Sequence, residues 1–152
     1  MWQAMFSVTN ALALAMWVVL VALPRRPFPL ALVLYGGVAL LCLAYTAGLA
    51  LVVSQGGLDF ASFTTIEGVR SIFATDAGVA IGWTHYLAFD LFTGLWIARD
   101  ADAKDFSRLV QVPFLLLTFM VGPVGLLAWF VARERKARGP GGWSRKGRNF
   151  AG

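Results

Sequence analysis

The chain has few of the residues on which soluble enzymes and metalloproteins depend. Of its 152 residues 14% are charged, one is a cysteine and one a histidine, whereas 59% are hydrophobic. The lone Cys42 excludes an intrachain disulfide and any cysteine-rich metal centre, and we predict no metal site. So little charge, with a mean hydropathy of +0.70, also excludes an ordinary soluble domain. The composition indicates an integral membrane protein.

The charge that is present is mostly positive and gathers near the C-terminal end. The formal net charge is +5, and seven of the thirteen Lys and Arg residues lie between Arg133 and Arg148, directly after an apolar run. We therefore interpret residues 133–152 as a flexible basic tail that meets anionic lipid headgroups. A nucleic-acid partner is not expected.

Four apolar runs predict transmembrane helices over residues 6–23, 30–53, 77–98 and 109–132. Each run is close to the roughly 20 residues that cross about 30 Å of hydrocarbon. Prolines at 24, 27 and 29 make a tight loop after the first run, so the first two spans should pack antiparallel. The predicted fold is an all-α integral membrane protein, a four-transmembrane-helix bundle that forms a single domain over residues 1–132.

A short interfacial helix is predicted over residues 65–74, between the second and third spans. Thr64 and Glu67 fit a capping box, and apolar residues then recur at helical spacing. The third span is entered through Thr75-Asp76, whose side chains suit the positive end of a helix. The linker over residues 99–108 carries six ionisable groups and is expected to be solvated.

Membrane orientation depends on the distribution of Lys and Arg. With four spans, the side that holds the N-terminus, the second loop and the tail carries eight of these residues, against five on the other side. This favours both termini in the cytoplasm. Arg25-Arg26, which directly follows the first span, favours the reverse orientation.

The third span carries the two residues that are best suited to take part in a reaction, Asp90 and His85. A carboxylate at the centre of a membrane helix costs about 2.5–3.5 kcal/mol on insertion scales, so it is expected to face protein and to have a functional or structural partner. The two side chains are five positions apart and point in different directions, so each needs a partner on another element. The candidate partners are Asn10, Tyr45, Thr46, Thr118, Glu67 and Arg70.

Several interpretations of these groups remain open. His85 can bond a neighbouring helix, serve as the single axial ligand of a haem or chlorophyll, or transfer protons. Glu67 is explained by helix capping alone, and Tyr86 and the tryptophans are compatible with packing or an interfacial position. No cofactor follows from these residues by themselves.

Glycine and proline mark places where helices approach closely or bend. Gly78 and Gly82 form a small-xxx-small pair that permits close helix contact. The sequence Gly122-Pro123-Val124-Gly125 should kink the fourth span in mid-membrane. Either feature is compatible with a cavity or with ordinary packing of a small bundle.

Three stretches resemble a known family. TTIEGVRSIFA, GWTHYLAFDLFTGLWIARDA and PFLLLTFMVGPVGLLAW, between about Thr64 and Trp129, are similar to the abscisic-acid-deficient-4-like family, polytopic membrane proteins whose plant members are associated with neoxanthin synthesis. The resemblance implies a carotenoid as substrate or ligand. It also implies isomerisation of an epoxy-xanthophyll, in which a ring epoxide opens and a proton leaves the polyene to give an allene.

That reaction needs an acid and a base. At the positions that match, the resemblance implies Asp90 or Glu67 as the base and His85 or Tyr86 as the proton donor. The residues expected to bind the substrate are Arg70, Trp83, Phe89 and Thr118. The chain starts almost at once with a span and shows no plastid transit peptide, so we expect a bacterial inner-membrane protein, whose substrate need not be that of the plant members.

Two other functions compete with a membrane isomerase. The first is a non-catalytic subunit that binds a pigment or lipid, or that bridges helices in a homo-oligomer or a larger membrane complex. The second is a proton or ion path, because acidic groups within spans mark such relays. Four short spans with one carboxylate would have to oligomerise to form a pore.

Overall fold

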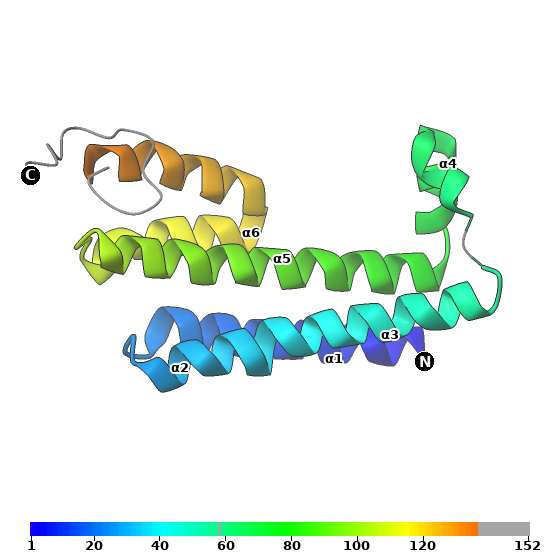
Figure 1. Cartoon of the computed structure of the whole chain (residues 1–152), viewed down its shortest axis with the longest axis horizontal. Helices are drawn as coiled ribbons and strands as arrows, with labels where there is room; N and C mark the ends of the chain where they lie inside the picture. The colour runs from blue at the N-terminus through cyan, green and yellow to red at the C-terminus, as the bar shows by residue number, and fades with distance from the viewer. Residues whose placement is uncertain (58, 137–152) are drawn as a thin grey trace, which may run out of the picture. The chain divides into compact units, whose positions relative to one another are not determined.

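The computed structural model describes residues 1–57 and 59–136, and in this part of the chain it is helical without strands. The chain divides into two compact units, residues 1–92 and 93–152. Helix α5 (Asp76–Ala103) contributes to both (Figure 1). Three helices are long and apolar enough to cross a membrane, namely Trp2–Ala22, Pro27–Ser54 and Arg108–Arg133. Helix α5 is not among them, since polar residues such as His85 and Asp90 interrupt its apolar sequence.

The first unit begins with two helical segments that pack against each other. Helix α1 (Trp2–Ala22) contacts α2 (Pro27–Ala31), the π-helix η1 (Leu32–Ala39) and α3 (Leu40–Ser54). The sequence of α1 is mostly apolar, with its polar residues in the first half, and it buries a face at Thr9, Ala13, Trp17 and Leu20. The predicted contact of the first two spans is confirmed, and the second begins at Pro27 rather than at residue 30 because proline suits the first turn of a helix.

Small residues let three helices meet in this unit. A Cβ on Gly37 would lie 2.7 Å from Met16 Cγ of α1 and 2.9 Å from Leu91 Cδ2 of α5. Gly48, three turns further on, faces Met5 and Ile81 in the same way. Lipid tails are as apolar as leucine, so helices in a membrane associate mainly through such close backbone approach.

The chain then passes through the 3₁₀ helix η2 (Phe60–Thr64) into α4 (Ile66–Phe73). The short predicted helix is confirmed, but the predicted capping box is wrong. The cap is Thr65, whose hydroxyl accepts a hydrogen bond of 3.1 Å from Gly68 N, while the Thr64 hydroxyl donates to Ala61 O. The 3₁₀ turn shifts the start of the helix by one residue and leaves Glu67 without a capping role.

Helix α5 begins as predicted and ends later than predicted. The Thr75 hydroxyl accepts from Gly78 N at 3.0 Å, which satisfies a free amide of the first turn. The helix continues through the predicted solvated linker as far as Ala103. Asp105 then takes a positive φ of 55°, and Ser107 leads into α6 (Arg108–Arg133). The linker is not fully solvated, because Lys104 is buried and the side chain of Asp100 is 7% exposed.

Helix α6 is not the straight fourth span that the sequence predicts. Val121 has non-helical angles, φ −147° and ψ 59°, ahead of Gly122 and Pro123. A straight helix of 26 residues is about 39 Å long. Here, however, the end of α6 lies beside its beginning, since Lys136 Nζ donates to Asp105 O at 2.8 Å. The helix is therefore folded into a hairpin, as the yellow and orange parts of the chain show (Figure 1).

The predicted kink in the fourth apolar run is thus confirmed, and the change of direction is large enough to fold α6 back on itself. Arg133 is a buried residue of α6 and not part of a flexible tail, and η3 (Glu134–Lys136) follows it. The rest of the predicted tail, residues 137–152, lies outside the described residues.

Candidate functional site

The first unit contains a cavity of about 510 Å³ between α3, η2, α4 and the first half of α5. Leu49, Val52, Ile72 and Ile81 form much of its apolar wall. Polar side chains gather at the end where α4 joins α5: Asp59, Ser62, Ser71 and Thr75. The volume falls within the roughly 300–1,000 Å³ of typical small-molecule sites.

The cavity depends on the two glycines that the sequence marks in α5. A Cβ on Gly78 would collide with the carbonyl of Ile72, and one on Gly82 would lie 2.5 Å from Phe73 Cε1. The predicted close approach is therefore present. The segment that approaches the glycines is the end of α4 rather than another long helix. The space left at the glycines allows Phe73 to pack against α5 and to form part of the cavity wall.

His85 lines the opposite end of the cavity, ten positions after Thr75 and so roughly 15 Å further along α5. Its ring lies 5.4 Å from the ring of Tyr45 and 4.6 Å from that of Phe89, measured between centroids. The pairing with Tyr45 was one of the predicted alternatives. Phe89 is 57% exposed and supports the imidazole from the next turn.

Asp90 does not line this cavity. Its carboxylate is buried and accepts a hydrogen bond from the side chain of Tyr86, one turn earlier on the same helix. The second oxygen, Oδ2, is buried without a hydrogen-bond partner among the described residues. The expected partner on another element is therefore not found in the described part of the chain, and Asp90 and His85 belong to different surroundings.

Trp83 and Tyr86 form an aromatic stack with α1. Trp83 Nε1 donates to Asn10 Oδ1 at 3.0 Å, and its ring lies 6.1 Å from Phe6 and 5.1 Å from Tyr86. Asn10, predicted as a partner of His85 or Asp90, is the partner of Trp83. These contacts link α1 to α5, and none of these side chains lines the cavity.

The remaining predicted residues lie apart from the cavity. Glu67 and Arg70 are exposed on α4, and neither is among the lining residues. Thr118 belongs to the second unit, where it is buried at the bend of α6 and donates to Phe114 O at 2.8 Å. Gly125 lies directly against Thr118, so the bend accounts for this threonine without a ligand.

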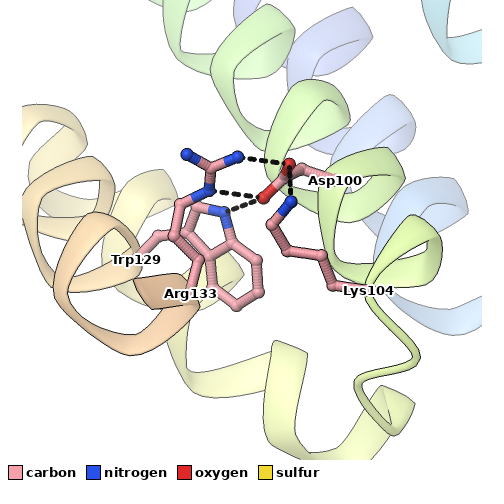
Figure 2. A network of polar contacts seen from close by, with 4 residues as sticks. All are labelled: Asp100, Lys104, Trp129 and Arg133. Carbon is pink, nitrogen blue, oxygen red and sulfur yellow. Dashed lines mark hydrogen bonds and ion pairs between the residues drawn. The ribbon is translucent and has the colours of Figure 1, made fainter. Parts of the chain in front are cut away.

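The second unit contains a polar cluster that the sequence did not lead us to predict (Figure 2). Arg133 donates two hydrogen bonds to Asp100, Nη2 to Oδ1 at 2.7 Å and Nε to Oδ2 at 2.8 Å. Trp129 Nε1 donates to the same Oδ2 at 3.0 Å, and Lys104 Nζ lies 3.3 Å from Oδ1. The sequence signal that could have indicated this cluster is the opposite charge at the ends of two apolar runs, Asp100 after the third and Arg133 after the fourth.

The charge of Asp100 is stabilised within this cluster. Burial raises the pKa of its carboxyl, but the hydrogen bonds from Arg133 and Trp129 and the positive charges of Arg133 and Lys104 outweigh burial, so the pKa lies below the usual value. Lys104 contributes charge alone, since its Nζ makes no hydrogen bond within the described residues. The arrangement closes the hairpin of α6 onto the end of α5.

No group of three or more His, Cys, Asp or Glu residues that could hold a metal ion occurs within residues 1–57 and 59–136. The sequence model of the family described as ABA DEFICIENT 4-like matches residues 4–129 of the chain. No curated protein and no solved structure matches it.

Proposed function

Because the chain belongs to the ABA DEFICIENT 4-like family, we propose that it binds a carotenoid or similar isoprenoid in the cavity of the first unit and isomerises it by acid–base chemistry. Family membership relates the chain to membrane proteins of neoxanthin synthesis. The observation that carries the proposal is the cavity itself, with an apolar wall and with His85 and Tyr45 facing each other at one end.

The two rings can supply both halves of the reaction. The isomerisation moves one proton to the epoxide oxygen and takes one from a polyene carbon, so no oxidant or reductant is needed. In our proposal the His85 imidazole takes the proton from carbon, and the Tyr45 hydroxyl donates to the oxygen. Because their rings are 5.4 Å apart, the proton can return from His85 to Tyr45 with little movement.

This assignment differs from the one that the resemblance implies. Asp90 and Glu67 are absent from the cavity lining, so we assign the base to His85 instead. We assign Asp90 and Tyr86 to packing of α5, since they bond each other. Tyr45 takes the place of Tyr86 as proton donor.

The proposal is tested with purified protein in detergent that contains an epoxy-xanthophyll, with the pigments analysed by absorbance and mass spectrometry. We expect His85→Gln to slow conversion about 10²- to 10⁴-fold, the usual contribution of a general base, without loss of pigment binding. Tyr45→Phe should slow it as well. Tyr35→Phe is the matched control, because Tyr35 is an exposed phenol outside the cavity. Equal conversion by all variants would contradict the assignment.

A non-catalytic pigment- or lipid-binding subunit is the second candidate. None of the predicted carboxylates lines the end of the cavity that His85 and Tyr45 form, and this favours binding without catalysis. In that case the pigment co-purifies with the protein and is recovered unchanged after prolonged incubation. Replacing Ile81 with Trp, which fills the cavity from α5, should then reduce the amount of bound pigment.

A further inference from the structure

The hairpin of α6 changes the way in which the chain can be threaded through a membrane. Each half, before and after Val121, has about a dozen residues and is roughly 18–20 Å long. Neither half can cross about 30 Å of hydrocarbon. Both ends of the hairpin are held together, by Arg133 on Asp100 and by Lys136 on Asp105. A segment that enters the bilayer and whose ends meet must leave on the side where it entered.

The irregular turn at the tip of the hairpin is compatible with membrane depth. Non-helical backbone is tolerated in hydrocarbon where protein covers it. Gly122 and Gly125 are buried, and Gly125 lies against the backbone of Thr118, while the side chain of Val121 is 46% exposed and apolar, so it suits contact with lipid. The hairpin has no charged residue between Leu109 and Ala132, so its tip is far from any charge along the chain, while ionisable groups gather at its two ends.

We propose that α6 is a re-entrant hairpin and that the chain crosses the membrane three times, through α1, the α2–α3 segment and α5. Helix α5, with 28 residues, is about 42 Å long and therefore sufficient to cross. The N-terminus and the basic tail then lie on opposite sides of the membrane. The expectation that both termini are cytoplasmic is replaced by an N-terminus outside and a tail inside.

The distribution of charge supports this threading independently of the hairpin contacts. With three crossings, one side receives the loop with Arg25-Arg26, the end of α5, the start of α6 and the whole basic tail. Arg70 is then the one Lys or Arg residue of the chain on the other side. Four straight spans divide the basic residues eight to five. The positive-inside rule therefore favours the re-entrant threading and places the basic side in the cytoplasm.

The threading also assigns a side to the cavity. Its polar end, at Asp59, Ser62, Ser71 and Thr75, belongs to the loop on the N-terminal side. A ligand would therefore reach it from the non-cytoplasmic side or from the outer leaflet. This last step rests on the proposed function, whereas the threading does not.

The test is labelling of single cysteines with a membrane-impermeant maleimide in spheroplasts that express the full chain. In a Cys42→Ser background, cysteine replaces Gln3, Ser71, Ser107 or Ser144 one at a time. We expect positions 3 and 71 to label in intact spheroplasts, and positions 107 and 144 to label only after permeabilisation. Fusions of alkaline phosphatase or green fluorescent protein to the C-terminus provide a second readout, in which the fluorescent protein alone should be active.

Labelling of position 144 on the same side as position 3 and opposite position 107 would overturn the re-entrant hairpin. Labelling of positions 3 and 107 on one side would overturn the crossing by α5. The experiment uses no pigment, so it can fail while the proposed function stands. Equally, the pigment assay with His85→Gln can fail while the threading stands.

Discussion

Different interactions stabilise the helix packing within each of the two units. In the first unit, residues 1–92, helices meet where Gly37 and Gly48 remove side-chain bulk, and the side-chain hydrogen bonds from α5 to α1, Trp83 to Asn10 and Thr84 to Thr9, join neutral groups. In the second, a buried carboxylate receives four contacts from Arg133, Trp129 and Lys104. Helices in lipid lack the hydrophobic driving force of water, so packing and polar bonds must replace it. The comparison shows one unit that relies on shape and one that relies on charge.

Asp100→Asn should have the largest effect, and it should be confined to the second unit. The substitution removes the one anion between two buried cations, and breaking a buried pair typically costs about 3–5 kcal/mol. We expect a lower unfolding midpoint in detergent and faster proteolysis between residues 93 and 136. Asp105→Asn is the control, because that side chain is exposed. Equal stability of the two variants would show that the cluster does not close the hairpin.

Acid should weaken the same unit to a smaller extent. Because the pKa of Asp100 is lowered in the folded protein, its contribution is complete above the unfolded value of about 3.9 and is lost as the pH falls through the lower folded value. The difference in stability between the wild type and Asp100→Asn should therefore be constant near neutrality. It should shrink below about pH 4 in thermal unfolding curves. A difference that grows with acid would have the wrong sign for this cluster.

Gly37→Ala tests the first unit, with Gly36→Ala as its neighbour control. The new Cβ at position 37 meets Met16 and Leu91 on two other helices, whereas at position 36 it meets only the flexible side chain of Leu32 within its own helix. Overpacking of this kind costs about 1–3 kcal/mol. The loss should be seen in the thermal stability of the first unit. If Gly36→Ala destabilises the protein more, shape is not what holds these helices together.

Trp83→Phe should have the smallest effect. It removes the bond to Asn10 and keeps an aromatic ring between Phe6 and Tyr86. Side-chain hydrogen bonds between membrane helices average about 0.6 kcal/mol, so the unfolding midpoint should change little. Trp96→Phe is the comparison in the second unit, where it keeps an edge contact with Phe130 and an aromatic face beneath Arg133. A large loss at Trp83 alone would mean that polar bonds are also decisive in the first unit.

Local patterns were good guides to helices and poor guides to contacts between them. The apolar runs predicted helix positions to within a few residues, and Thr75 was identified as an entry residue. Thr64 was chosen over Thr65 because capping patterns do not reveal a preceding 3₁₀ turn. The end of α5 was missed because six ionisable residues resemble a solvated loop unless their partner is known, and Arg133 is 33 positions away from Asp100.

The candidate site was predicted in part. His85 was singled out, and Tyr45 stood among its possible partners, because polar side chains are rare within spans. The spacing of His85 and Asp90 placed them on different faces of one helix, but it did not reveal that His85 faces a cavity and Asp90 does not. Phe73 was missed because its place in the cavity wall depends on the absence of side chains at Gly78 and Gly82.

By itself the sequence determined that this is a helical membrane protein, where its helices lie, which family it belongs to and which helix carries its polar groups. Those properties follow from composition and from periodicity along the chain. Only the tertiary structure decided that α6 folds back on itself and that His85 faces a cavity while Asp90 does not. Both depend on contacts between residues far apart in sequence, which no local pattern encodes.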